Sequence, residues 1–153
     1  MKPPPSNWSR ISSALYYEDA PKMIDWLCRA FGFEVRLKIE GEGGRIDHSE
    51  LTYGEGLVMV GDAREAHKPA RRAFCKSPRQ LGGANTQSMM IYVDDVEAHC
   101  ARARAAGAEI VAEPKTSDYG EEHWADRGYE CVDPEGHHWW FCQRLRDAKQ
   151  KNA

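Results

Sequence analysis

The residues best suited to proton transfer are His48 and Glu50, which stand two positions apart in a stretch rich in strand-forming residues. In a β-strand, alternate residues share a face, so this imidazole and this carboxylate could act as an acid–base pair. The same spacing is also typical of an ordinary polar pair on the solvated face of a sheet. Both interpretations stay open at the level of the sequence.

A second stretch carries residues that could bind a ligand by stacking. Trp139 and Trp140 are adjacent in the aromatic run 137–142. Neighbouring residues of a strand face opposite sides of the sheet, so one indole can join the core while the other lines a pocket. We predict that Trp140 is the pocket wall, with simple core packing as the alternative.

The turn before this run is predicted to close a β-hairpin. Pro134 sets φ at the first corner, Gly136 can adopt a positive φ, and Asp133 can accept hydrogen bonds from the backbone of the turn. Runs rich in aromatic and β-branched residues flank the turn at 129–132 and 137–142.

The elements around these residues are predicted twice in the same order: a strand, a helix and three further strands. In the first copy they fall at 11–17, at a helix between Asp19 and Gly32, and at 33–40, 45–53 and 57–60. In the second they fall at 88–93, at a helix between Asp95 and Gly107, at 108–113 and at the two hairpin strands. The near-constant offset between the copies indicates an internal repeat. A long polar loop is expected at 115–124.

We therefore predict an α+β protein that forms one domain from two βαβββ modules. The first module spans 11–61 and the second 87–143, with a basic linker at 62–86 and a charged tail at 144–153. Residues 1–10 are expected to be an extended, proline-rich lead-in. The linker is either a solvated connection or a basic flap over a pocket that accepts an anion.

Composition restricts the class of protein. The chain has 153 residues, a net charge of −3 and 29% charged residues, which is ordinary for a soluble domain and argues against a general nucleic-acid binder. Five widely spaced cysteines without a C-x-x-C pair favour reduced thiols and a cytoplasmic location. No apolar run approaches membrane-spanning length, so no membrane partner is expected.

Four segments, in this order and at the repeat spacing, resemble the glyoxalase/bleomycin-resistance/dioxygenase superfamily, also called vicinal oxygen chelate (VOC) proteins. They are AFGFEV, HSELTYGEGLVMVGD, YVDDVEAHCARARAAGAEIV and ADRGYECVDPEGHHWWF. Within this superfamily the chain is most similar to the PhnB-like branch. The resemblance spans about residues 11–143. It implies an open, mixed β-sheet barrel that encloses a cleft between the two modules, and a homodimer.

Enzymes of this superfamily usually hold a divalent metal with four side chains, from the first and last strand of each module. The corresponding positions here are Ser12, Met59, Ser88 and Trp140. None is a usual ligand of such a metal, so we expect no metal and no other cofactor.

The resemblance then implies a polar and aromatic cleft. Its expected ligand-binding residues are Ser12, Tyr16, Met59, Ser88, Met90, Tyr92, Trp124, His138 and Trp140. Trp124 belongs to the predicted loop at the lip of the cleft. Asp126 and Arg127 are expected to form an ion pair there, and His99 is expected to be exposed.

These features favour a metal-free protein that binds a small molecule. The alternative is a lyase or isomerase of the glyoxalase type that uses His48 and Glu50, or displaced metal ligands. A third possibility is a module that acts through protein partners. The sequence does not identify the ligand.

Overall fold

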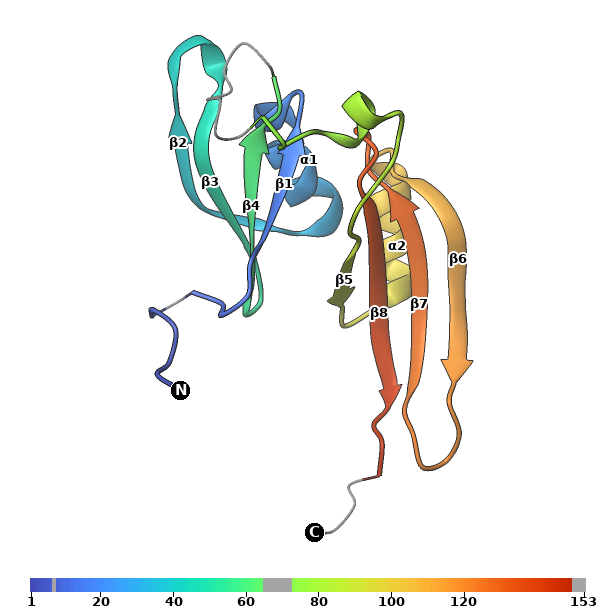
Figure 1. Ribbon diagram of the computed structural model, residues 1–153. Coiled ribbons are helices and arrows are strands. Elements are labelled where there is room, and N and C mark those ends of the chain that lie inside the picture. The colour runs from blue at the N-terminus through green and yellow to red at the C-terminus, as the bar shows by residue number, and fades with distance from the viewer. Residues whose placement is uncertain (7, 65–72, 150–153) are drawn as a thin grey trace. The chain divides into compact units, whose positions relative to one another are not determined.

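The computed structural model describes residues 1–6, 8–64 and 73–149. The chain divides into two compact units, Met1–Ala84 and Asn85–Ala153, and each is described by itself (Figure 1).

The first unit is a four-stranded mixed sheet with a helix on one face. Its elements are β1 (Ser13–Tyr17), α1 (Ala20–Phe31), β2 (Glu34–Glu40), β3 (Ile46–Tyr53) and β4 (Gly56–Asp62), with short 3₁₀ helices at Glu42–Gly44 and Pro78–Leu81. The strand order is β1-β4-β3-β2, in which β1 runs parallel to β4 and the other pairs are antiparallel.

Helix α1 begins and ends where the sequence predicts. The Asp19 side chain accepts a hydrogen bond from the backbone N–H of Lys22, and Gly32 ends the helix with a φ of 87°. An apolar stripe of the helix is buried, and it includes Met23, Ile24, Leu27 and Phe31.

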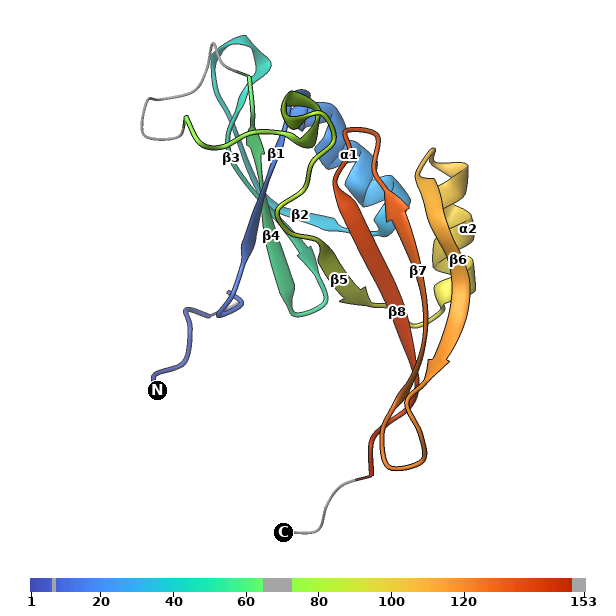
Figure 2. The same cartoon turned by 45° about the vertical axis from the view of Figure 1, so that its right-hand side comes forward.

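The second unit repeats this arrangement. Its elements are β5 (Met89–Tyr92), α2 (Val96–Ala105), β6 (Glu109–Asp118), β7 (Ala125–Val132) and β8 (His138–Arg146). The order is β5-β8-β7-β6, again with the first strand parallel to the last, and α2 covers one face of the sheet (Figure 2). The predicted α+β class with two βαβββ modules is confirmed. Each module forms its own four-stranded sheet, and the described residues form no closed barrel.

Two boundaries in the second unit differ from the prediction. Strand β6 continues to Asp118, so only 119–124 remain of the loop predicted at 115–124, and β8 continues to Arg146. Lys115, Thr116 and Ser117 pair with residues of β7 although none of them is apolar. Because β6 is an edge strand that is exposed along this part, it shows no alternation of apolar and polar residues by which the sequence could reveal it.

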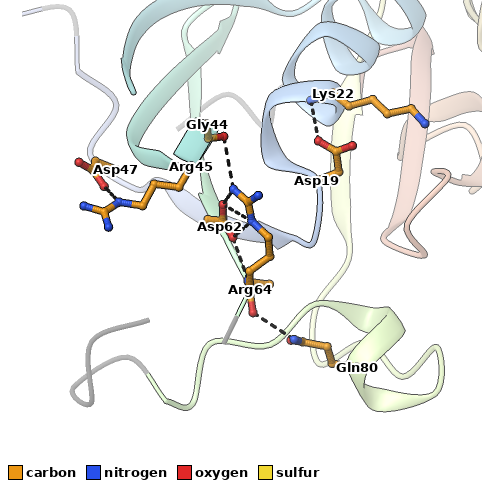
Figure 3. Close-up of polar contacts among 9 residues, drawn as sticks. Asp19, Lys22, Gly44, Arg45, Asp47, Asp62, Arg64 and Gln80 are labelled. Atoms are coloured by element: carbon orange, nitrogen blue, oxygen red, sulfur yellow. Dashed lines mark hydrogen bonds and ion pairs between the residues drawn. The ribbon is translucent and has the colours of Figure 1, made fainter. Parts of the chain in front are cut away.

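The predicted basic linker has local structure in the part that is described. Ser77 and Gln80 form a capping box at the 3₁₀ helix Pro78–Leu81. The Gln80 amide also donates a 3.0 Å hydrogen bond to the carbonyl of Ala63, drawn as a dashed line from Gln80 in Figure 3. Beside it, Arg64 forms an ion pair with Asp62 at the end of β4. Half of the linker's basic residues (Lys68, Arg71 and Arg72), together with the suggested flap, lie outside the described residues.

The hairpin turn is organised by the buried carboxylate of Asp133. Its Oδ1 accepts hydrogen bonds from the backbone N–H groups of Glu135 and His137, at 2.9 and 3.1 Å, and its Oδ2 accepts one from Trp139 Nε1 at 3.1 Å. Gly136 has the positive φ that the turn requires. The predicted role of Asp133 as an acceptor for the turn is confirmed.

The core between α2 and its sheet contains a polar group that was expected on the surface. His99 is 5% exposed, and its Nδ1 lies 2.8 Å from the Tyr129 hydroxyl. The Tyr129 ring stacks on Phe141. The prediction that His99 is exposed was therefore wrong, because a hydroxyl on a distant strand provides a partner that spacing along the helix does not reveal.

Among the described residues, no helix is both long and apolar enough to cross a membrane.

Candidate functional site

Strand β8 presents its two adjacent tryptophans to opposite faces of the second sheet. Trp139 is fully buried on the face that α2 covers, whereas Trp140 is 45% exposed on the other face, here called the open face. In the register, Trp140 stands opposite Met90 of β5 and Glu130 of β7. Met90 is itself 51% exposed. An indole and a thioether therefore lie next to each other on a surface that the helix leaves free.

The open face ends in a group of polar and aromatic side chains around Arg144. The Nε–H of Arg144 donates a 2.6 Å hydrogen bond to Asp126, and Nη2 donates to the Tyr92 hydroxyl. The guanidinium carbon lies 5.1 Å from the ring centroid of Tyr92 and 5.9 Å from that of Trp124. The hydrogen bond to Asp126 raises the pKa of Arg144 above its ordinary value, so this group stays a cation.

The predicted ion pair between Asp126 and Arg127 was wrong. Asp126 pairs with Arg144 on the open face, and Arg127 pairs with Glu97 of α2 on the other face. Adjacent residues of β7 cannot meet across a strand, because their side chains point to opposite sides.

A shallow depression of about 320 Å³ lies beside this group. It is lined by Tyr92, Val93, Asp94, Gln143 and Arg144. Its wall therefore combines one aromatic ring with a cation and polar groups.

The first sheet also has a face opposite its helix, and there His48 and Glu50 are in contact. His48 Nε2 lies 2.8 Å from Glu50 Oε1, and Arg36 Nη1 lies 3.0 Å from Glu50 Oε2. Glu50 is only 6% exposed. Because a buried carboxylate needs partners for its charge, both oxygens of Glu50 are engaged by basic side chains.

Two of the predicted ligand-binding residues, Met59 and Tyr16, belong to this face of the first sheet, and a third, Ser12, lies just before β1. Met59 stands opposite Glu50 in the register, and it pairs with Ala14 of β1. The Tyr16 ring covers Gly61, where a Cβ would come within 2.9 Å of the ring. The Ser12 hydroxyl lies 3.0 Å from that of Ser9.

The remaining predicted residues are spread over the second unit. Ser88 is exposed just before β5, and Trp124 packs on Tyr119 in the loop 119–124, with 5.1 Å between ring centroids. His138 is half-buried, and its backbone N–H donates to Asn85. Within this unit the structure brings Met90 next to Trp140, and it joins Tyr92 to Trp124 through Arg144.

The sequence did not point to Arg144, Arg36 or Trp8, whose indole lies over the Arg36 guanidinium at 5.2 Å. Arg144 fell in the segment predicted as a charged tail, and Trp8 in the lead-in. No local signal links residues so far apart in the chain.

The side chains at the four positions predicted for the superfamily's metal ligands, Ser12, Met59, Ser88 and Trp140, do not fit a divalent metal. Two hydroxyls, a thioether and an indole stand where imidazoles and carboxylates are needed. Among the described residues, no group of three His, Cys, Asp or Glu side chains is arranged to hold a metal ion.

Comparison with known proteins agrees with this fold. The family model of the Glyoxalase/Bleomycin resistance protein/Dioxygenase superfamily matches residues 10–141, and the chain belongs to that superfamily.

Several solved and sequenced proteins are similar to it. The crystal structure of TioX from Micromonospora sp. ML1 is 33% identical, with a TM-score of 0.65 over 90% of this chain and 99% of that one. TnmS3, described as an antibiotic binding protein from Streptomyces sp. CB03234, is 19% identical, with a TM-score of 0.59 over 89% and 96%. The uncharacterized protein Mb0911c of Mycobacterium bovis is 29% identical over 90% of this chain and 85% of its own length.

Proposed function

We propose that this protein binds a planar aromatic small molecule without a metal, and that Trp140 on the open face of the second module provides the stacking surface. The observation that carries the proposal is the exposure of Trp140 beside Met90, while its neighbour Trp139 fills the core. The exposed indole and thioether form an apolar patch, and such patches are typical of ligand-binding or partner-binding surfaces.

The chemistry of the open face supports an aromatic ligand with a polar edge. Trp140 and Met90 offer a flat and a polarizable apolar surface, which suit ring stacking. Arg144, held by Asp126, Tyr92 and Asp147, places a fixed guanidinium at one end. A ligand that stacks on the indole and presents an acceptor toward the guanidinium would use both features.

TnmS3, described as an antibiotic binding protein, has the same fold, so this fold is compatible with small-molecule binding. At 19% identity that likeness reaches only the fold. The donor set at Ser12, Met59, Ser88 and Trp140 supports binding that needs no metal. The PhnB-like branch, the homodimer, the cytoplasmic location and the position of the ligand relative to the first module stay predictions.

Fluorine NMR on protein labelled with 5-fluorotryptophan tests this function, because the chain has only five tryptophans. Caffeine and 2-naphthol serve as planar probes. The fluorine resonance that disappears in Trp140→Phe is that of Trp140. We expect the Trp140 signal to shift saturably, while the signal of the buried Trp139 changes little. Trp8→Phe is the matched control, because it removes a tryptophan that belongs to the first unit. No saturable shift of Trp140 with either probe would contradict the proposal.

A second candidate function is proton transfer by His48 and Glu50. The 2.8 Å contact between the two side chains favours it, together with the half-exposure of the imidazole. Deuterium exchange at the α-carbon of hydroxyacetone, followed by NMR, measures proton abstraction directly. An enzyme of this kind should accelerate exchange, and Glu50→Gln should slow it by about 100-fold or more. His123→Gln changes an exposed histidine of the second module and is the control. Exchange at the uncatalysed rate would remove this candidate.

A further inference from the structure

The segment before β1 is given a local shape by hydrogen bonds among its own residues. The backbone N–H of Trp8 donates to the carbonyl of Pro5 at 3.1 Å, and the Arg10 side chain donates to the carbonyl of Lys2 at 2.6 Å. The Ser9 hydroxyl donates to the carbonyl of Ile11 at 2.7 Å. These contacts give the arm, defined here as the described residues of 1–12, a local shape that presents the Trp8 indole to the sheet.

The Trp8 indole packs on the guanidinium of Arg36, and Arg36 pairs with the buried carboxylate of Glu50. The guanidinium carbon is 5.2 Å from the Trp8 ring centroid, and Nη1 is 3.0 Å from Glu50 Oε2. The register of β2 with β3 shifts between Val35 and Leu37, so Arg36 is the extra residue of a bulge. A bulge re-aims the side chain of the extra residue, and here that side chain reaches Glu50 on the neighbouring strand.

The resulting stack runs from solvent to the interior. Trp8 is half-buried, Arg36 is one-third exposed and Glu50 is 6% exposed, with His48 on the second carboxylate oxygen. A planar guanidinium that pairs edge-on with a carboxylate still offers its flat face to an aromatic ring. The ring in turn keeps water from the Arg36–Glu50 pair, which strengthens their attraction.

We propose that the flat face of Arg36 is an aromatic-binding site, and that Trp8 of the chain's own arm is its resident occupant. An electron-rich planar molecule with the ring chemistry of indole would compete with Trp8 for this place, so the arm inhibits binding to the first module. Since the contacts of the arm are local and largely exposed, it can leave the sheet without disturbing the core. This site is built from residues of the first unit alone, and the proposal does not rest on the one made for Trp140.

Titration with indole tests the site, observed through the Nε–H of Arg36 and the ring of His48 by ¹H–¹⁵N NMR. A competing occupant raises the apparent Kd by the reciprocal of the open fraction. If the arm is closed in roughly nine molecules of ten, Trp8→Ala should lower the Kd for indole about tenfold. Trp8→Phe retains a ring and should behave like the wild type. Adding Arg36→Met to Trp8→Ala should abolish the response.

A measurement on the unaltered chain complements the variants. Saturating indole should move the Trp8 Nε1–H resonance to the position of a solvent-exposed tryptophan, because the arm is displaced. Trp140→Phe should leave the Kd at Arg36 unchanged, which separates this site from the second module. Three results would each overturn the proposal. They are equal Kd values for the wild type and Trp8→Ala, an Arg36 signal that does not move in Trp8→Ala, and a wild-type Trp8 signal that does not move.

Discussion

Replacing Trp139 and Trp140 by alanine, one at a time, should separate stability from binding. Trp139 is fully buried, and its Nε1–H donates to Asp133. Truncation of a buried tryptophan costs about 3–5 kcal/mol. The acceptor left without its partner adds about 1 kcal/mol. The free energy of unfolding of Trp139→Ala should therefore fall by about 4–6 kcal/mol.

Trp140→Ala should lower the free energy of unfolding much less, because 45% of the Trp140 surface is already exposed. A tryptophan buries up to about 250 Å², and little more than half of that area is removed from water here. At about 25 cal/mol per Å² the loss is at most about 3.5 kcal/mol, and we expect about 2 kcal/mol once residual burial in the unfolded chain is included.

Urea unfolding followed by circular dichroism measures both losses, and titration with caffeine or 2-naphthol measures binding. Trp139→Phe, which keeps a ring but loses the hydrogen bond, should bind the probe and unfold at an intermediate urea concentration. Trp140→Ala should be folded and unable to bind. If Trp140→Ala lost as much stability as Trp139→Ala, or if it bound the probe as well as the wild type, the assignment of Trp140 to a binding surface would be refuted.

Three further substitutions probe the second module. Asp133→Asn should lower the free energy of unfolding, measured by urea denaturation, by about 1–3 kcal/mol, because an amide N–H would face Trp139 Nε1–H. An unchanged free energy would contradict the role of the carboxylate. Burial raises the pKa of the Cys131 thiol from 9.0 to about 12, so the unfolded thiol ionises first and stability should fall as pH rises above 9.0. Cys131→Ala should remove that part of the pH dependence, whereas an identical slope would show that another group causes it. The hydrogen bond from Arg146 lowers the pKa of Asp118, so the stability that this ion pair provides is lost as pH falls below the ordinary carboxyl pKa of 3.8. Arg146→Gln should return the pKa of Asp118, measured by NMR, toward 3.8, and an unchanged pKa would contradict this assignment.

The fold could be predicted from local signals that are strong in this chain. Asp19 and Gly32 mark the ends of α1, and the Asp133 turn marks the hairpin, because each must satisfy backbone groups at a defined place. The edge strand β6 could not be bounded in the same way. Its polar residues are held by pairing with β7 and not by burial, so no apolar alternation marks where it ends.

The candidate site could be predicted only in part. Adjacent tryptophans on a strand must face opposite ways, and this placed Trp139 and Trp140 correctly on two faces. The contact between His48 and Glu50 followed from their spacing. In contrast, three contacts join different strands or segments: Arg36 with Glu50, Trp8 with Arg36, and Arg144 with Tyr92. Each contact depends on strand register and side-chain reach, which the sequence alone does not show.

The most direct test of metal-free aromatic binding compares one titration under two conditions. Protein labelled with 5-fluorotryptophan is dialysed against EDTA, and 2-naphthol is added with and without one equivalent of zinc or nickel per chain. We predict that the Trp140 resonance shifts with the same Kd in all samples. A shift that appears only when a stoichiometric metal is bound would contradict the proposed function and favour an enzyme with displaced ligands.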